Sequence, residues 1–420
     1  MQMKKYKLGD IATVEISGVD KKITDGEKEI RLCNFVDVYY NWAITIAQHD
    51  SFMLATARPN EISKFQLKKG QVALTKDSET RDDIGISTYI ADDFENVILG
   101  YHCALISPNK DILDGCYLNA LLHTDYAKKY FACNASGSGQ RYALSVEALN
   151  SFPVPIIPLH EQKQIGEIFS ALDKKIELNR QINQNLEAMA KQLYDYWFVQ
   201  FDFPNEEGKP YKSSGGEMVW NEKLKRNIPV GWHCGNLFEI AVFTNGLACQ
   251  KFRPKDDEVP LPVIKIREMH DGISVDTEEV TSNIPESVKV YNGDVLFSWS
   301  ASLEVMLWAY GLGGLNQHIF KVTSANDFPK SFYYFQLLDY VDVFKKMAEA
   351  RKTTMGHITQ DHLQQSTIAI PDNKDIADKF EELISPIFKQ IVKLQEEISN
   401  FIKQRDELLP LLMNGQITIE

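Results

Sequence analysis

The sequence predicts an α+β protein: two globular mixed α/β domains, joined by two long antiparallel coiled-coil helices and related by internal duplication. Three observations lead to this prediction. A set of segments occurs twice along the chain, a long apolar heptad pattern follows each copy, and a polar, turn-rich linker separates the copies. A length of 420 residues agrees with two to four domains of about 100–200 residues each.

The best-matched repeated segments lie roughly 214 residues apart. Residues 143–149 are followed by residues 154–158, and residues 357–363 are followed by residues 368–371. Each pair predicts a short helical turn with Ser or Thr at the N-cap, then an apolar strand that ends at proline. Fainter matches lie upstream, between residues 8–12 and 237–241, 70–75 and 293–298, and 99–102 and 315–318.

A heptad pattern follows each copy for about four and a half heptads, which predicts a long helix. The first helix carries its pattern at Ile165, Ile168, Leu172, Lys175, Asn179, Ile182, Leu186, Met189, Leu193 and Tyr196. The second carries it at Phe380, Ile384, Ile387, Ile391, Leu394, Ile398, Phe401, Arg405, Leu408 and Leu412. We expect the helices to pack on each other in antiparallel orientation, with the polar positions fixing the register, and we expect Pro386 to bend the second helix or delay its start.

These patterns divide the chain into five segments, and the linker is marked by turn residues around 204–210 and 213–216. The predicted segments are a first globular domain at 1–158, a long helix at 159–200, the linker at 201–230, a second globular domain at 231–372 and a second long helix at 373–414.

Composition excludes several classes of protein. Hydrophobic content of 44% and charged content of 25% are ordinary for a folded soluble protein. No stretch approaches the ~20 apolar residues of a membrane span, and the start of the chain lacks the apolar part of a secretory signal. We therefore expect a cytoplasmic protein without a membrane partner. Six scattered cysteines without a C-x-x-C motif predict free thiols rather than a metal site.

The net charge of −13 argues against a protein that coats DNA, because non-specific affinity comes from neutralising phosphates with Lys and Arg. It leaves room for a sequence reader that has local basic patches. In that case partners would supply part of the positive surface.

Catalytic motifs are missing from the sequence. There is no phosphate-binding P-loop, no G-x-S-x-G nucleophile elbow, no H-E-x-x-H and no Asn-Pro-Pro-aromatic tetrad. The glycines at 311–314 lack dinucleotide-binding spacing and predict a plain turn. We expect that the chain itself is not an enzyme.

Several of these segments, in this order, resemble the specificity subunit of type I restriction–modification systems over nearly the whole chain. They are the helix opening at 158–162, the Gly-x-Val strands at Gly70 and Gly293, the loop at 136–141, and the linker at 202–211 that leads to 228–232. The second copy departs from the pattern at 371–374, where the helix opens without Glu-Gln, and at 352–356, where the loop differs.

The resemblance implies two target recognition domains, which each read one part of a split, asymmetric site in double-stranded DNA. It also implies that two methyltransferase subunits and the restriction (translocase–nuclease) subunits join through the helices. S-adenosylmethionine, ATP and magnesium would belong to those partners, with no cofactor bound by this chain. The docking positions on the helices would be Ile165, Ile168, Leu172, Ile182, Leu186, Met189, Leu193, Ile384, Ile391, Leu394, Ile398 and Leu408.

The helices would also act as a ruler. A helix of about 37 residues spans roughly 55 Å, which equals about 16 base pairs. The two halves differ strongly in sequence, so we expect the half-sites to differ as well.

Base recognition needs polar or cationic side chains on loops that face a DNA groove. The candidates in the first half are Lys76, Arg81, Ser138, Gln140 and Arg141, and those in the second half are Lys251, Arg253, Lys255, Arg351, Lys352 and Thr353. The competing interpretation is that these charges form solvated surface. We expect Tyr142 and Trp299 to lie in the core.

Two other functions remain open from the residues. The first is a diverged nuclease or methyltransferase, in which paired acids such as Asp82-Asp83 or Asp92-Asp93 bind metal. The second is a coiled-coil scaffold without a role in DNA recognition. Methylation or cleavage by the chain alone would identify the former, and failure to bind DNA with or without a partner would favour the latter.

Overall fold

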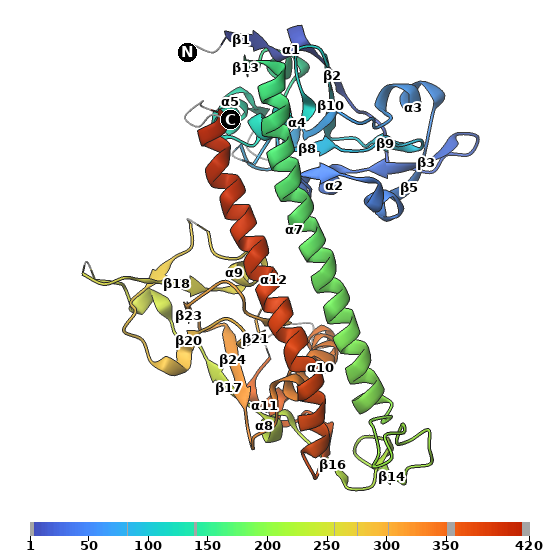
Figure 1. The fold of residues 1–420 in the computed structure, drawn as a ribbon, viewed down its shortest axis with the longest axis vertical. Coiled ribbons are helices and arrows are strands. Elements are labelled where there is room, and N and C mark those ends of the chain that lie inside the picture. Colours follow the sequence, from blue (N-terminus) through green and yellow to red (C-terminus); the bar gives the residue numbers. More distant parts are fainter. Residues whose placement is uncertain are drawn as a thin grey trace. The chain divides into compact units, whose positions relative to one another are not determined.

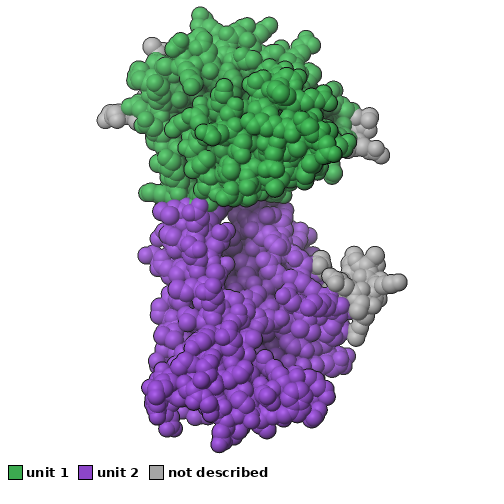
Figure 2. Space-filling view, turned by 90° about the vertical axis from the view of Figure 1, so that its right-hand side faces the viewer, with its two compact units in different colours: residues 1–177, 401–420 green, residues 178–400 purple. Residues whose placement is uncertain are grey.

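The chain forms two compact units in a computed structural model that describes residues 4–81, 83–137, 141–255, 257–274, 276–300, 302–350 and 358–413. Unit 1 comprises residues 1–177 with 401–420, and unit 2 comprises residues 178–400 (Figure 2). Two long helices, α7 (Leu159–Tyr194) and α12 (Asp375–Met413), contribute residues to both units. None of the helices in the described ranges combines the length and apolar character needed to cross a membrane.

Unit 1 is a mixed α/β domain. Its strands are β1 (Lys4–Lys7), β2 (Ala12–Ile16), β3 (Lys28–Cys33), β4 (Ala43–Ile44), β5 (Met53–Ala57), β6 (Val72–Thr75), β7 (Asp77–Ser78), β8 (Ser87–Ile90), β9 (Val97–Leu99), β10 (Cys103–Pro108), β11 (Ser136–Gly137), β12 (Tyr142–Ala143) and β13 (Pro153–Ile156). Its shorter helices are α1 (Leu8–Ile11), α2 (Phe35–Tyr40), η1 (Ile46–Ser51), α3 (Pro59–Phe65), α4 (Gly115–Leu122), α5 (Asp125–Asn134) and α6 (Val146–Asn150).

The main sheet of unit 1 has the strand order β2-β10-β6-β8-β4. β10 pairs antiparallel with both β2 and β6, and its residues from Cys103 to Ile106 are fully buried, as a strand covered on both faces requires. Helices α2 and α4 pack on β6 and β8 (Figure 1). A second sheet, β5-β3-β9, and a small sheet, β11-β12-β7, complete the unit.

Unit 2 is also mixed α/β. Its strands are β14 (Met218–Asn221), β15 (Arg226–Pro229), β16 (Trp232–Gly235), β17 (Ala241–Asn245), β18 (Leu261–Ile264), β19 (Glu279–Val280), β20 (Lys289–Val290), β21 (Val295–Ser298), β22 (Glu304–Leu307), β23 (Gly313–Leu315), β24 (Ile319–Ser324) and β25 (Ile368–Pro371). Its shorter helices are η2 (Asp195–Val199), α8 (Leu237–Ile240), η3 (Cys249–Lys251), α9 (Ile266–Asp271), η4 (Glu286–Val288), α10 (Lys330–Ala350) and α11 (Gln360–Gln364).

Strand pairing confirms the predicted duplication. β24 pairs with β17 and β21 in unit 2 as β10 pairs with β2 and β6 in unit 1. The parallel pair of β18 with β23 repeats that of β3 with β9, and the outer pair of β16 with β25 repeats that of β1 with β13. The copies also differ, because α10 is one continuous helix where unit 1 has α4 and α5, separated at His123 and Thr124.

The long helices pack antiparallel within each unit. In unit 2, the Asn179 amide donates to Glu397 Oε2 at 3.1 Å, and the Asn183 amide donates to the carbonyl of Ile391 at 3.3 Å. In unit 1, Lys175 Nζ lies over the ring of Phe401, 5.3 Å from its centroid. Partner numbers fall along α12 as they rise along α7, which confirms the predicted orientation, and the two asparagines supply register-fixing polar contacts.

The heptad pattern of the first long helix predicts that Met189 and Tyr196 are buried, and this prediction is wrong. Met189 is 45% exposed and Tyr196 is 38% exposed, whereas Ala190 and Tyr194 are buried. The reason is that this part of α7 packs on the core of unit 2 as well as on α12: the Tyr194 ring lies 5.1 Å from that of Phe335 in α10. A helix buried on two sides has a wider apolar face than the a/d positions alone.

In α12, burial agrees better with the predicted heptad positions than it does in α7. Ile384, Ile391, Leu394 and Ile398 are buried as expected, and Phe388 joins them. The expectation that Pro386 delays the helix is wrong, because α12 begins at Asp375 and continues past the proline. Burial of the flanking apolar side chains, at ~1.5–3 kcal/mol each, offsets the ~3 kcal/mol that an interior proline costs.

Gly166 lets α7 approach α4 closely in unit 1. A Cβ at this position would lie 3.0 Å from both Asp114 Oδ1 and Cys116 Cβ. The Gly166 carbonyl also accepts a hydrogen bond from Cys116 Sγ at 3.2 Å. Together with Gln162, whose side-chain oxygen accepts from the Asp114 backbone N–H at 2.9 Å, these contacts attach the start of α7 to unit 1.

Candidate nucleic-acid interface

Three of the predicted DNA-binding residues gather at one edge of unit 1. Lys76 precedes β7, Arg81 follows it, and Arg141 precedes β12. β7 pairs antiparallel with β12, with Ala143 opposite Asp77 and Tyr142 opposite Ser78. We call Lys76, Arg81 and Arg141 the unit 1 basic cluster. The pairing of Tyr142 with Ser78 and of Ala143 with Asp77 brings two segments that are distant in sequence into one surface.

A backbone hydrogen-bond frame holds this cluster at the start of the central strand β10. The N–H of Lys76 donates to the carbonyl of His102 at 2.9 Å, and the N–H of Leu144 donates to the carbonyl of Lys76 at 2.8 Å. His102 has a positive φ of 74°, which turns the chain sharply into β10. The side chains at this edge are therefore fixed by the sheet rather than by a free loop.

A buried carboxylate organises the cluster. Asp77 is 6% exposed, and it accepts from Lys76 Nζ at 3.0 Å and contacts His102 Nδ1. Burial, the largest influence, opposes ionisation of Asp77, but hydrogen bonds from His102 and Lys76 outweigh burial and lower the pKa of this carboxyl. One carboxylate thus positions several donors while the cluster keeps an excess of positive charge.

Arg141 extends outward from this centre. Its Nη2 atom lies 2.8 Å from His102 Nδ1 and 3.7 Å from Asp77 Oδ2, and its side chain is 57% exposed. Arg81 stacks over Tyr142, with its guanidinium carbon 5.0 Å from the ring centroid. Tyr142 is half-buried rather than in the core as expected. A guanidinium held at one end and open at the other can form a bidentate contact with guanine or phosphate.

Three of the predicted basic residues of unit 2 are also on the surface. Lys251, Arg253 and Lys255 are exposed, in and after η3. The backbone N–H of Lys255 donates to Glu258 Oε1 at 2.7 Å, which orders the turn. The remaining candidates, Ser138, Gln140, Arg351, Lys352 and Thr353, lie outside the described residues.

Sequence reasoning did not select Asp77 and His102. Neither belongs to a motif, and their contact depends on two strands that are 25 residues apart in sequence. A usable signal was present for His102, because the matched segments 99–102 and 315–318 both end in histidine. Among the described residues no group of three or more His, Cys, Asp or Glu side chains could hold a metal ion.

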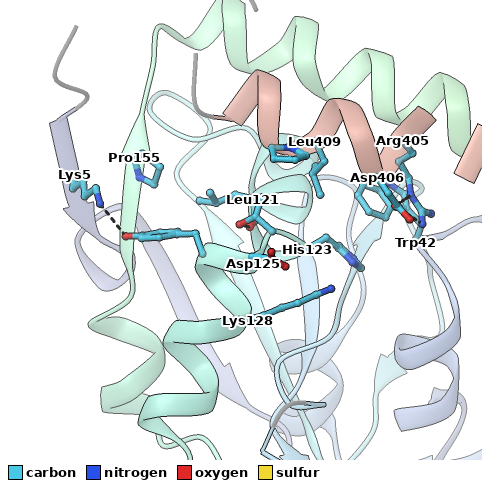
Figure 3. A pocket seen from close by; sticks show the side chains of 13 residues that line it. Lys5, Trp42, Leu121, His123, Asp125, Lys128, Pro155, Arg405, Asp406 and Leu409 are labelled. Atoms are coloured by element: carbon cyan, nitrogen blue, oxygen red, sulfur yellow. Dashed lines mark hydrogen bonds and ion pairs between the residues drawn. The ribbon is translucent and has the colours of Figure 1, made fainter. Parts of the chain in front are cut away.

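A separate cavity in unit 1 lies beside the C-terminal turns of α12 (Figure 3). It has a volume of about 580 Å³. Arg405 lies over the ring of Trp42, 4.9 Å from its centroid, and that indole stacks on His123 at 4.3 Å. This stack attaches the end of α12 to unit 1.

His123 makes the stack sensitive to acid. Burial is the main cause, and with Arg405 and Lys128 nearby it lowers the pKa of His123 from 6.5 to about 3. The unfolded chain binds a proton at His123 below pH ~6.5 while the folded chain does not, so stability falls as the pH drops from 6.5 toward 3. The slope from this group is at most ~1.4 kcal/mol per pH unit.

We predict that His123→Gln reduces this acid sensitivity, because the amide can still donate to the Ser87 carbonyl that His123 Nε2 contacts at 2.8 Å. Urea unfolding at pH 7, 5.5 and 4.5 measures the free energy of unfolding of both proteins. As the pH falls, the free energy of unfolding of the variant should rise relative to that of the original chain. A difference that stays constant over this range would contradict the role of His123.

Comparison with known proteins adds family-level findings. A family model described as "Type I restriction modification DNA specificity domain" matches residues 2–188 and again residues 229–406. The chain is 25% identical over 320 residues to the type I restriction enzyme MjaIX specificity subunit of Methanocaldococcus jannaschii, covering 74% of this chain and 71% of that protein. It is 24% identical over 413 residues to the HindI specificity subunit of Haemophilus influenzae, covering 84% and 88%.

A solved structure shares the fold. The crystal structure of a type I restriction–modification system S subunit from M. genitalium matches with a TM-score of 0.58 and 14% sequence identity. The match covers 98% of this chain and 96% of that one. At this identity the similarity concerns the architecture of the chain alone.

Proposed function

Because the chain belongs to the family of type I restriction–modification DNA specificity domains, we propose that it recognises a bipartite, asymmetric site in double-stranded DNA and carries enzymatic subunits to that site. The family model matches the chain twice, once in each half. Two domains, each reading one half-site, account for this arrangement.

The proposal rests on one observation: the two units share the same strand pairing but carry different side chains at the same edge. The central strands β10 and β24 have equivalent partners, yet the side chains at their starts differ between the units. Equivalent frames dock on DNA in equivalent ways, while different side chains read different bases. The half-sites are therefore unlike in sequence.

The long helices serve as the ruler and as the docking surface for partners. Of the predicted docking positions, Met189 is 45% exposed and available for contact with other subunits, as are Leu178 at 56% and Leu383 at 49%. The predicted docking positions Ile165, Ile384, Ile391, Leu394 and Ile398 are instead buried within the chain. Methyltransferase and restriction subunits supply the catalysis and bind S-adenosylmethionine, ATP and magnesium. The chain contributes recognition and no chemistry of its own.

Binding of a duplex library by the chain, co-expressed with its methyltransferase partner, tests this function. We expect selection of one bipartite sequence with unlike halves. Equal binding of all sequences, or no binding with or without the partner, would support a scaffold instead. Methylation or cleavage by the purified chain alone would support a diverged enzyme.

We predict that the complex contains two methyltransferase subunits for each copy of this chain. The physical reason is the duplication, which presents one helix-and-domain surface in each half and so two equivalent docking sites. Native mass spectrometry of the co-expressed complex measures the ratio. A limit of one to one in excess partner would contradict the prediction.

A further inference from the structure

The hydrogen-bond frame of the unit 1 basic cluster has a close counterpart in unit 2. The N–H of Trp299 donates to the carbonyl of His318 at 3.3 Å, and the N–H of Ile358 donates to the carbonyl of Trp299 at 3.0 Å. These bonds repeat those that join Lys76 to His102 and Leu144 to Lys76. Trp299 therefore occupies the position of Lys76, and His318 occupies that of His102.

A third bond extends the equivalence. The N–H of Gln317 donates to the carbonyl of Leu247 at 2.8 Å, as the N–H of Tyr101 donates to the carbonyl of Val19 at 2.9 Å. Gln317 therefore takes the position of Tyr101, next to the histidine that precedes each central strand. The backbone places the three unit 2 side chains on the edge that the basic cluster occupies in unit 1.

The unit 2 side chains form a connected polar and aromatic surface. Trp299 Nε1 donates to Asn245 Oδ1 at 3.2 Å, and its ring lies 5.6 Å from that of His318. Gln317 Nε2 lies 3.3 Å from His318 Nε2. Asn245 and His318 are exposed, while Trp299 and Gln317 are half-buried. Trp299 was expected in the core; it is only partly buried there, with its ring 5.9 Å from that of Phe320.

Chemistry differs between the two equivalent edges. Unit 1 presents Lys76 and Arg141, which carry fixed positive charge. Unit 2 presents an indole, an amide and an imidazole, which can donate, accept or stack. A glutamine amide matches the N6 and N7 atoms of adenine, and an apolar ring edge matches the methyl group of thymine.

We propose that Trp299, Gln317 and His318 read the bases of the half-site bound by unit 2, and that Gln317 recognises an A·T base pair. This inference rests on the proposed function and deepens it. The indole of Trp299 and the amide of Gln317 carry no charge, and they lie at the edge where unit 1 uses cations. Its phosphate contacts come from other residues, such as Lys251 and Arg253.

The salt dependence of binding distinguishes neutral from cationic contacts. Each phosphate neutralised by a cation contributes about −0.9 to the slope of log K against log salt. Loss of Trp299 or Gln317 should therefore weaken specific binding by the same factor at every salt concentration. Loss of a phosphate-contacting lysine or arginine should reduce the slope.

The test uses the full chain in complex with its methyltransferase partner and a duplex that carries the selected site. We expect Gln317→Ala to weaken specific binding about 5- to 150-fold, the equivalent of ~1–3 kcal/mol, without a change of slope. Genome methylation mapping should show relaxed specificity at one A·T position of one half-site. Trp299→Ala should weaken binding in the same parallel manner.

Trp220→Ala is the matched control, because Trp220 is an exposed tryptophan in β14, 52% exposed and bonded to Glu222. It should leave affinity and specificity unchanged. If Trp299→Ala lowers the melting temperature, Gln317→Ala and His318→Ala decide the question, since both side chains reach the surface.

The outcomes separate the two proposals. A wild-type complex that selects no sequence overturns the proposed function. A selective wild-type complex whose affinity, specificity and slope survive Gln317→Ala and His318→Ala overturns this inference alone. A drop of about one in the slope would show a charged contact and would also overturn it.

Discussion

Lengthening both long helices by four residues is expected to increase the distance between the two half-sites by one or two base pairs, with both half-site sequences unchanged. Each residue of an α-helix adds about 1.5 Å, so four residues add about 6 Å, and one base pair rises about 3.4 Å. Four residues also turn the helix by little more than one full turn, which approximately keeps its buried face. The half-sites stay the same because the globular units read them.

The structure indicates where to insert the residues. Lys175 packs on Phe401 within unit 1, and Asn179 bonds Glu397 within unit 2. Insertion after Glu177 in α7 and after Ser399 in α12 lengthens both helices while keeping these contacts. Inserting four residues into one helix alone would shift its apolar face out of register with that of the other helix and lower the stability of the protein.

Methylation mapping in cells that carry the variant with its partner measures the recognised spacing. The control inserts four residues after Glu207, in the exposed turn of the linker, which lengthens the chain but neither helix. It should leave the spacing unchanged. An active helix variant that methylates the original site with the original spacing would show that the long helices do not set the distance between the half-sites.

Arg141→Ala is expected to have the largest effect of any single change in the unit 1 basic cluster. Its guanidinium is held by His102 and lies 3.7 Å from Asp77, so it is positioned in advance for a bidentate contact. If the contact is to a base, its loss should cost ~1–3 kcal/mol and relax one position of the half-site of unit 1. If it is to a phosphate, all sequences should weaken alike and the salt slope should fall by about 0.9.

Binding of the complex to a duplex library at several salt concentrations measures both effects. Arg58→Ala is the matched control, since Arg58 is a surface arginine of the same unit whose side chain is 69% exposed and paired with Glu27. Arg141→Lys should recover part of a phosphate contact but little of a bidentate base contact. Wild-type affinity, specificity and slope in Arg141→Ala would remove this residue from the interface.

Local sequence signals predicted the elements that depend on neighbouring residues. Ser145 caps α6 by accepting from the N–H of Ala148, as its position before an apolar turn predicted. The heptad of α12 predicted the burial of Ile384 and Ile391. The heptad of α7 failed at Met189 because a periodic pattern does not reveal that a helix packs on a domain and on another helix at once.

Sequence by itself therefore determined the duplication, the two long helices and the class of function, because these are recorded in repeated segments and in periodic burial. Only the tertiary structure decided which side chains meet. Asp77 reaches His102 and Arg141 through the pairing of strands that are far apart in the chain. Trp299 was placed at the position equivalent to that of Lys76 by a backbone frame that no single segment encodes. The physical reason is that a binding surface depends on strand register and side-chain packing, and both are set by contacts between distant residues.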